Sequence, residues 1–298
     1  MSISEVRNSM NEQQYSPSNF SILPPVVKNL LIINGLFFMA TLAFGNFFHI
    51  DLINLLGLRY YESDQFHFYQ IVTYMFMHST ENFGHIFFNM FALWMFGSTL
   101  ENYWGGKKFL VYYLLTGIGA AVTHYIVVYF QISPDLHLLD ACIQDPTLAN
   151  VTDLWSDHHF AFRRESIDMQ SAFQIFKQNY GLLLSGNDSA TVQGAINAFL
   201  VDYREYYVGL PNIVGASGSV FGILLAFGMM FPNAKIYLYF LFPIKAKWFV
   251  IVYGALELYF GISGTNDGIA HFAHLGGMIF GIILILLWKK RGKNPYEY

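Results

Sequence analysis

The strongest constraint on this fold is a series of apolar segments whose lengths match the thickness of a lipid bilayer. Over half of the residues are apolar, and only 12% are charged. About 20 consecutive apolar residues cross the hydrocarbon core of a membrane as an α-helix. The sequence therefore predicts an all-α polytopic membrane protein. Its six expected spans cover about residues 27–48, 83–100, 109–130, 214–231, 248–264 and 269–288.

The connections that carry lysine follow the second, fourth and sixth spans, at Lys107, Lys108, Lys235, Lys245, Lys247, Lys289 and Lys290. Basic loops remain on the cytoplasmic side, so both termini are expected inside a plasma (inner) membrane. The expected organisation is a polar, disordered cytoplasmic tail (1–25), a six-helix membrane domain (26–130 and 213–290), an extracytoplasmic insertion (131–212) and a cytoplasmic tail (291–298).

The insertion has helical patterning of its own. Apolar residues recur at helical spacing over 166–184 and 191–207, and Gly186-Asn187-Asp188 separates the two stretches. A connection of about 80 residues is too long to be structureless in a compact protein. We therefore expect a small helical cap or an interfacial helical pair, which covers the site described below or helps to select substrates.

Charge and cysteine content limit the other function classes. The net charge of −4 gives no indication of nucleic-acid binding, so lipid and membrane proteins are the expected partners. Cys142 is the single cysteine, which excludes an intramolecular disulfide. The first 25 residues are polar and have no apolar region near Met1, so no signal peptide is expected. The sequence does not set the oligomeric state.

Four polar residues fall at similar depths in three of the spans. The second, fourth and sixth spans enter from the outer face, because the topology alternates. His85, Ser217 and His274 lie within the first two turns of these spans, and Asn89 lies one turn below His85. Each has an ordinary structural interpretation when taken alone, such as a serine hydroxyl bonded to its own helix. Four such residues at similar depth in the spans instead indicate a functional site.

Glycines accompany these residues in the fourth and sixth spans. Gly218 and Gly222, and Gly277 and Gly281, form two small-xxx-small faces, which let helices approach closely. A serine and its base on separate helices need such an approach, because the base must come within roughly 3 Å of the hydroxyl. Packing alone would also explain these glycines.

These residues resemble those of rhomboid intramembrane serine proteases. The resemblance lies in His-Ile-Phe-Phe-Asn at 85–89, Gly-Ala-Ser-Gly at 215–218 and Ala-His-Leu-Gly-Gly-Met-Ile-Phe-Gly at 273–281. It implies a six-helix rhomboid-like bundle and a Ser-His dyad without a carboxylate, in which Ser217 is the nucleophile and His274 the general base. It assigns the oxyanion contacts to His85, Asn89 and the Ser217 backbone, with transmembrane proteins as substrates and neither a cofactor nor a metal. The supporting residues are Gly215, Gly218, Phe221, Gly277 and Gly281.

The chain also departs from the family pattern. Phe221 stands where some members have a tyrosine beside the catalytic histidine, so an aromatic face is kept and a hydroxyl is lost. The insertion is longer than in compact members. His271 lies three residues before His274, but only His274 has glycine three and seven residues later. We therefore expect His271 to stand outside the dyad.

Four other interpretations remain open. A metalloprotease would need a third ligand beside His271 and His274, and no His-Glu-x-x-His occurs. A soluble-type hydrolase elbow would need glycine where Ser219 stands. A transporter could use Glu257 in the fifth span as a proton relay. The alternative of most weight is a rhomboid-like protein that binds client transmembrane segments without cleaving them.

Overall fold

The computed structural model describes residues 20–164, 166–238, 241–264 and 270–290. Most of the expected N-terminal tail and all of the C-terminal tail lie outside these residues. Five helical spans in the described chain are long and apolar enough to cross a membrane. They are α2 with η1 (Pro25–Ala43 and Phe44–Phe48), α5 with η3 and α6 (Phe83–Ala92, Leu93–Gly97 and Ser98–Trp104), α7 (Gly106–Gln144), α12 (Ala246–Ser263) and α13 (His271–Lys290).

The fourth expected span is the short helix α11 (Ser217–Met230), of 14 residues. It lies among α7, α12 and α13, and ten of its residues are buried, from Gly218 to Gly228. A helix that is apolar on every side is a buried helix. Surrounded by protein, α11 does not need the length of a lipid-exposed span. The expected start at residue 214 was three residues too early, because residues 214–216 form the connection that enters the bundle.

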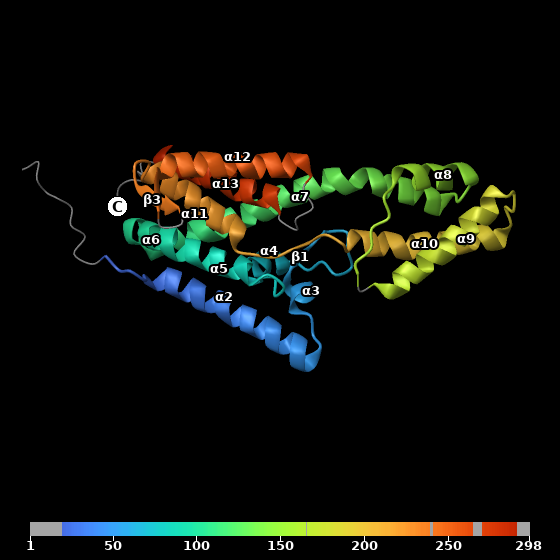
Figure 1. Ribbon diagram of the computed structural model, residues 1–298, viewed down its shortest axis with the longest axis horizontal. Coiled ribbons are helices and arrows are strands. Elements are labelled where there is room, and N and C mark those ends of the chain that lie inside the picture. The colour runs from blue at the N-terminus through green and yellow to red at the C-terminus, as the bar shows by residue number, and fades with distance from the viewer. Residues whose placement is uncertain (1–19, 165, 239–240, 265–269, 291–298) are drawn as a thin grey trace, which may run out of the picture.

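The insertion consists of helices that pack around a second apolar core. They are α8 (Leu148–Asp157), α9 (Ile167–Leu184) and α10 (Ala190–Val208). The last two match the expected helices to within one residue, whereas α8 was not expected. Figure 1 shows all three grouped at one end of the molecule, beyond the membrane helices, with α7 running between the two parts.

The predicted boundary at residue 131 falls inside α7, which continues without a break to Gln144. Pro134 lies within this helix, and a proline is usually a reason to end one. The helix continues because its apolar face extends beyond Pro134. Ile132, Leu136 and Leu139 are buried in the core of the insertion. Tertiary packing therefore outweighs the local signal here.

Two short strands connect the loop between the first and second spans with the chain that leads to Ser217. β1 (Leu58–Arg59) follows α3 (Leu52–Leu56) and pairs antiparallel with β2 (Asn212–Ile213). The Arg59 guanidinium donates to the Gly209 carbonyl at the end of α10, and Arg163 donates to the same carbonyl at 3.1 Å. Burial and the neighbouring Arg163 lower the pKa of Arg59 to about 10, so it remains charged at neutral pH. This contact holds the entry to α11 in place.

The remaining connections are short. A buried amide of Gln70 in α4 (Gln70–Thr73) donates to the carbonyls of Leu55 and Gln65, and η2 (Tyr74–Phe76) leads toward α5. After α11, the lysine-bearing loop forms a hairpin of β3 (Lys235–Leu238) and β4 (Phe242–Lys245), with Lys235 paired to Lys245.

The start of α2 is capped by a carboxylate from another helix. Glu101 of α6 is 4% exposed, and its two oxygens accept the backbone N–H groups of Val26 and Val27 at 2.9 and 2.7 Å. The first N–H groups of a helix have no partner within it, and a negative charge there also complements the helix dipole. Glu101 therefore fastens the first span to the second.

Replacing Glu101 by alanine should lower the free energy of unfolding by about 2–4 kcal/mol, because two buried N–H groups lose a charged acceptor. Unfolding by denaturant in detergent micelles, followed by circular dichroism, measures this change. Glu81→Ala is the control, since Glu81 is exposed before α5 and should change stability by less than about 0.5 kcal/mol. Equal effects of the two variants would contradict the capping role.

Candidate active site

Ser217 is the first residue of α11, at the point where the incoming chain turns into the bundle. The preceding N-cap residue is Ala216, and Gly215 has a φ of +130° that favours glycine. The Gly215 N–H donates to the Tyr74 carbonyl at 2.9 Å, which anchors this turn. Within the described chain, the Ser217 hydroxyl makes no hydrogen bond to its own helix. The backbone geometry thus leaves the hydroxyl available to other groups.

His274 lies in the first turn of α13 and stacks on Phe221. The ring centroids are 4.2 Å apart, and the planes differ by 7°. Phe221 stacks in turn on Tyr253 of α12, with centroids 5.3 Å apart. Phe221 is four residues after Ser217, so the two side chains share one face of α11. The stack therefore holds the imidazole over the face that carries the serine.

The glycines predicted to support the site lie at close helix contacts. A methyl group added at Gly277 would overlap the carbonyl oxygen of Gly218, so α13 meets the backbone of α11 one turn below His274. Gly218 instead faces Ala120 of α7, and Gly281 faces the Tyr112 hydroxyl of the same helix. The tightest approach of the fourth and sixth spans at these glycines is thus at Gly277. The other glycines make room for α7.

His85 of α5 approaches the same turn from another side. A methyl group added at Gly215 would lie 2.9 Å from His85 Nε2 and 3.5 Å from Ser217 Oγ. Asn89 is buried one turn below, and its amide donates to the His85 carbonyl at 2.9 Å. His78, missed by the sequence interpretation, is fully buried with its ring 5.2 Å from that of His85. Burial lowers the pKa of His78 to about 3, so it is neutral at physiological pH.

Glu257 of α12 also lies at the site, which the sequence interpretation did not foresee. Its Oε2 atom is 2.8 Å from His274 Nδ1 and 2.7 Å from His271 Nδ1. All three residues are buried. His271, expected to lie apart from the dyad, is therefore linked to His274 through one carboxylate oxygen. The sequence does contain one indication of this role. Glu257 is a charged residue within a span, and such a residue marks a functional site by default.

The same trio supplies the third ligand that the metal interpretation required. One ligand atom from each of Glu257, His271 and His274 lies within 4.8 Å of the other two. Zinc with ligands at roughly 2.0–2.1 Å keeps neighbouring ligand atoms about 3.3 Å apart. The separations of 2.7 and 2.8 Å are those of charge-assisted hydrogen bonds. The geometry favours hydrogen bonding over shared metal coordination.

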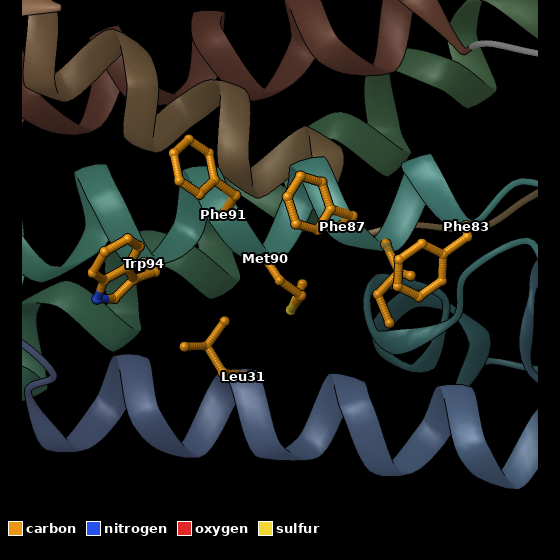
Figure 2. A pocket seen from close by; sticks show the side chains of 7 residues that line it. Leu31, Phe83, Phe87, Met90, Phe91 and Trp94 are labelled. Carbon is orange, nitrogen blue, oxygen red and sulfur yellow. The ribbon is translucent and has the colours of Figure 1, made fainter. Parts of the chain in front are cut away.

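A separate apolar groove of about 350 Å³ lies between α2 and α5. Figure 2 shows Leu31 of α2 facing Met90 and Trp94 across this groove. The lining residues are Leu31, Phe83, Ile86, Phe87, Met90, Phe91 and Trp94. At 100° per residue, the lining positions of α5 lie opposite His85 and Asn89. The groove therefore has no part in the chemistry at Ser217.

Comparison with known proteins identifies the family. The Rhomboid domain model matches residues 65–132 and 180–291, together more than half of the chain, and the protein belongs to the rhomboid family. This confirms the resemblance seen in the sequence and the all-α polytopic fold class. Residues 133–179, which include α8 and the first part of α9, lie outside the match, whereas α10 falls within it.

A distant relative is an uncharacterized mitochondrial rhomboid protein of the fission yeast Schizosaccharomyces pombe. It is 29% identical over 87 residues, which are 27% of this chain and 22% of that protein. The match thus covers about a fifth of the relative's length. It supports the family relationship and leaves activity to be argued from the site.

Proposed function

We propose that this protein is an intramembrane serine endopeptidase that cleaves transmembrane segments near the outer membrane face. Ser217 is the nucleophile and His274 its general base. The observation that carries the proposal is the stacking of His274 on Phe221, one turn from Ser217 on the same face of α11. Together with the contact of Gly277 with Gly218, it brings a base and a hydroxyl from two helices to one level.

The reaction proceeds in two stages. His274 Nε2 takes the Ser217 hydroxyl proton while Oγ attacks the substrate carbonyl carbon, and the peptide C–N bond breaks as the proton passes to the leaving amine. A water then attacks the acyl-enzyme, again with His274 as base. This releases the new carboxyl end and restores the Ser217 hydroxyl.

The oxyanion formed in each stage needs hydrogen-bond donors. The Ser217 N–H lies at the start of α11, where the first N–H groups have no partner within the helix and the dipole favours negative charge. His85 lies beside the same turn. Asn89 donates one amide hydrogen to the His85 carbonyl, which leaves its second for the oxyanion. Such donors are most effective where bulk water is excluded.

The substrates proposed are transmembrane proteins, and surrounding lipid is the other partner. Lysines on the connections after the second, fourth and sixth spans support a plasma (inner) membrane with both termini in the cytoplasm. The fission-yeast relative is described as mitochondrial. Fractionation of cells that express the tagged protein would separate these two locations.

Covalent labelling tests the proposal without knowledge of the substrate. A fluorophosphonate should modify Ser217 of the purified protein, because a base-activated serine attacks phosphorus, and mass spectrometry locates the adduct. Ser219→Ala should label normally, since the Ser219 hydroxyl is buried and donates to the Tyr113 carbonyl at 2.7 Å. Absence of a Ser217 adduct in folded wild-type protein would favour the non-catalytic binder of client segments.

A further inference from the structure

Glu257 is a carboxylate buried within a membrane span. It lies on α12, where Ala246 and Val250 are its only buried companions among the residues of that helix. An ionised carboxylate in a low-dielectric surrounding is costly unless it is paired and hydrogen-bonded. Both imidazole contacts of Glu257 fall on one oxygen, at 2.7 and 2.8 Å. The position of this charge is therefore explained by the two histidines that it contacts.

The contact to His274 determines which ring nitrogen carries a proton. A carboxylate oxygen 2.8 Å from Nδ1 is an acceptor, so Nδ1 is the protonated nitrogen and Nε2 keeps its lone pair. The stacking on Phe221 fixes the plane of the ring, and the contact to Glu257 fixes its rotation within that plane. The two constraints together define where Nε2 lies.

We propose that Glu257 is a positioning residue for His274, and that it converts the Ser217–His274 pair into a chain of three groups. The inference rests on the proposed protease function. When the Ser217 proton moves to Nε2, the ring becomes an imidazolium, and the nearby carboxylate stabilises that charge without taking a proton. The Nδ1–H bond is kept throughout. The resemblance to the family implied a dyad that needs no such group.

His271 has an indirect role, because it contacts Glu257. It is three residues before His274, one helical turn away, and its Nδ1 donates to the same carboxylate oxygen at 2.7 Å. A second donor restricts rotation of the carboxylate and offsets part of the cost of burying it. His271 thus acts on His274 through Glu257.

The test compares Glu257→Gln with wild-type protein in proteoliposomes that contain a single-span reporter. Glutamine keeps the volume and removes the charge, so kcat should fall about 100-fold while KM remains within a factor of about two. The rate of fluorophosphonate labelling at Ser217 should fall in parallel, because it reports the activation of the hydroxyl. Glu257→Asp keeps the charge with a shorter reach and should retain an intermediate rate. His271→Gln should lower kcat less than Glu257→Gln.

Matched controls separate positioning from folding and from metal binding. Glu81→Gln makes the same chemical change at an exposed site before α5 and should leave every rate unchanged. Thermal unfolding establishes whether each variant is folded. If Glu257→Gln is unfolded, Glu257→Asp is compared with wild-type protein instead. Unchanged kcat and labelling in the folded Glu257 variant would overturn the proposal. Activity that is lost on addition of EDTA and recovered on addition of zinc would also overturn the proposal. A wild-type protein that never labels would instead overturn the protease function itself.

Discussion

Replacing Ser217 or His274 by alanine is expected to lower kcat for cleavage of a single-span reporter by at least about 10³-fold. Without the hydroxyl there is no nucleophile, and without the imidazole the hydroxyl keeps its proton at neutral pH. The double variant should be no slower than either single variant, because two groups that act in one step are lost together when either is removed. Independent roles would give losses that multiply.

The measurement uses purified protein in proteoliposomes and single-turnover conditions, so that slow product release does not hide the chemical step. Ser219→Ala is the matched serine control, and His137→Ala is the histidine control because His137 is exposed on α7 beyond the bundle. Both should retain wild-type kcat. Cleavage that persists in Ser217→Ala and His274→Ala would show that the dyad is wrong.

The helices of the insertion illustrate what local sequence determines. Those over 166–184 and 191–207 were predictable because an amphipathic period and a Gly-Asn-Asp break are properties of a few adjacent residues. The observed helices, Ile167–Leu184 and Ala190–Val208, agree closely. The continuation of α7 past Pro134 was not predictable in this way. It depends on Ile132 and Leu136 packing against helices that come later in the chain.

In the candidate site, too, some features follow from local sequence and others only from packing. The alternating direction of the spans predicts His85, Ser217 and His274 at similar depth, because depth follows from counting residues along each helix. The contact of Glu257 with His274 depends instead on how α12 is rotated about its own axis. Residue counting does not give that rotation. It follows from contacts such as the stacking of Tyr253 on Phe221, which require the packed structure.

Replacing Gly277 by alanine should reduce activity about 100-fold or more and lower the free energy of unfolding by roughly 3 kcal/mol. The added methyl group would overlap the Gly218 carbonyl, which is backbone and cannot move aside like the end of a side chain. The helices α11 and α13 must therefore separate. His274 lies on α13 and Ser217 precedes Gly218, so the same shift pulls base and nucleophile apart.

Gly35→Ala in α2 is the matched control for this variant, because its methyl group would meet no atom within 4 Å apart from its chain neighbours and the backbone of its own helix turn. Alanine is the better helix former, so this change should be neutral or stabilising by up to about 1 kcal/mol. Comparing unfolding with the rate of Ser217 labelling distinguishes two consequences of Gly277→Ala. A folded variant that labels slowly has lost the approach of His274 to Ser217, whereas labelling and stability equal to Gly35→Ala would refute the contact between α11 and α13.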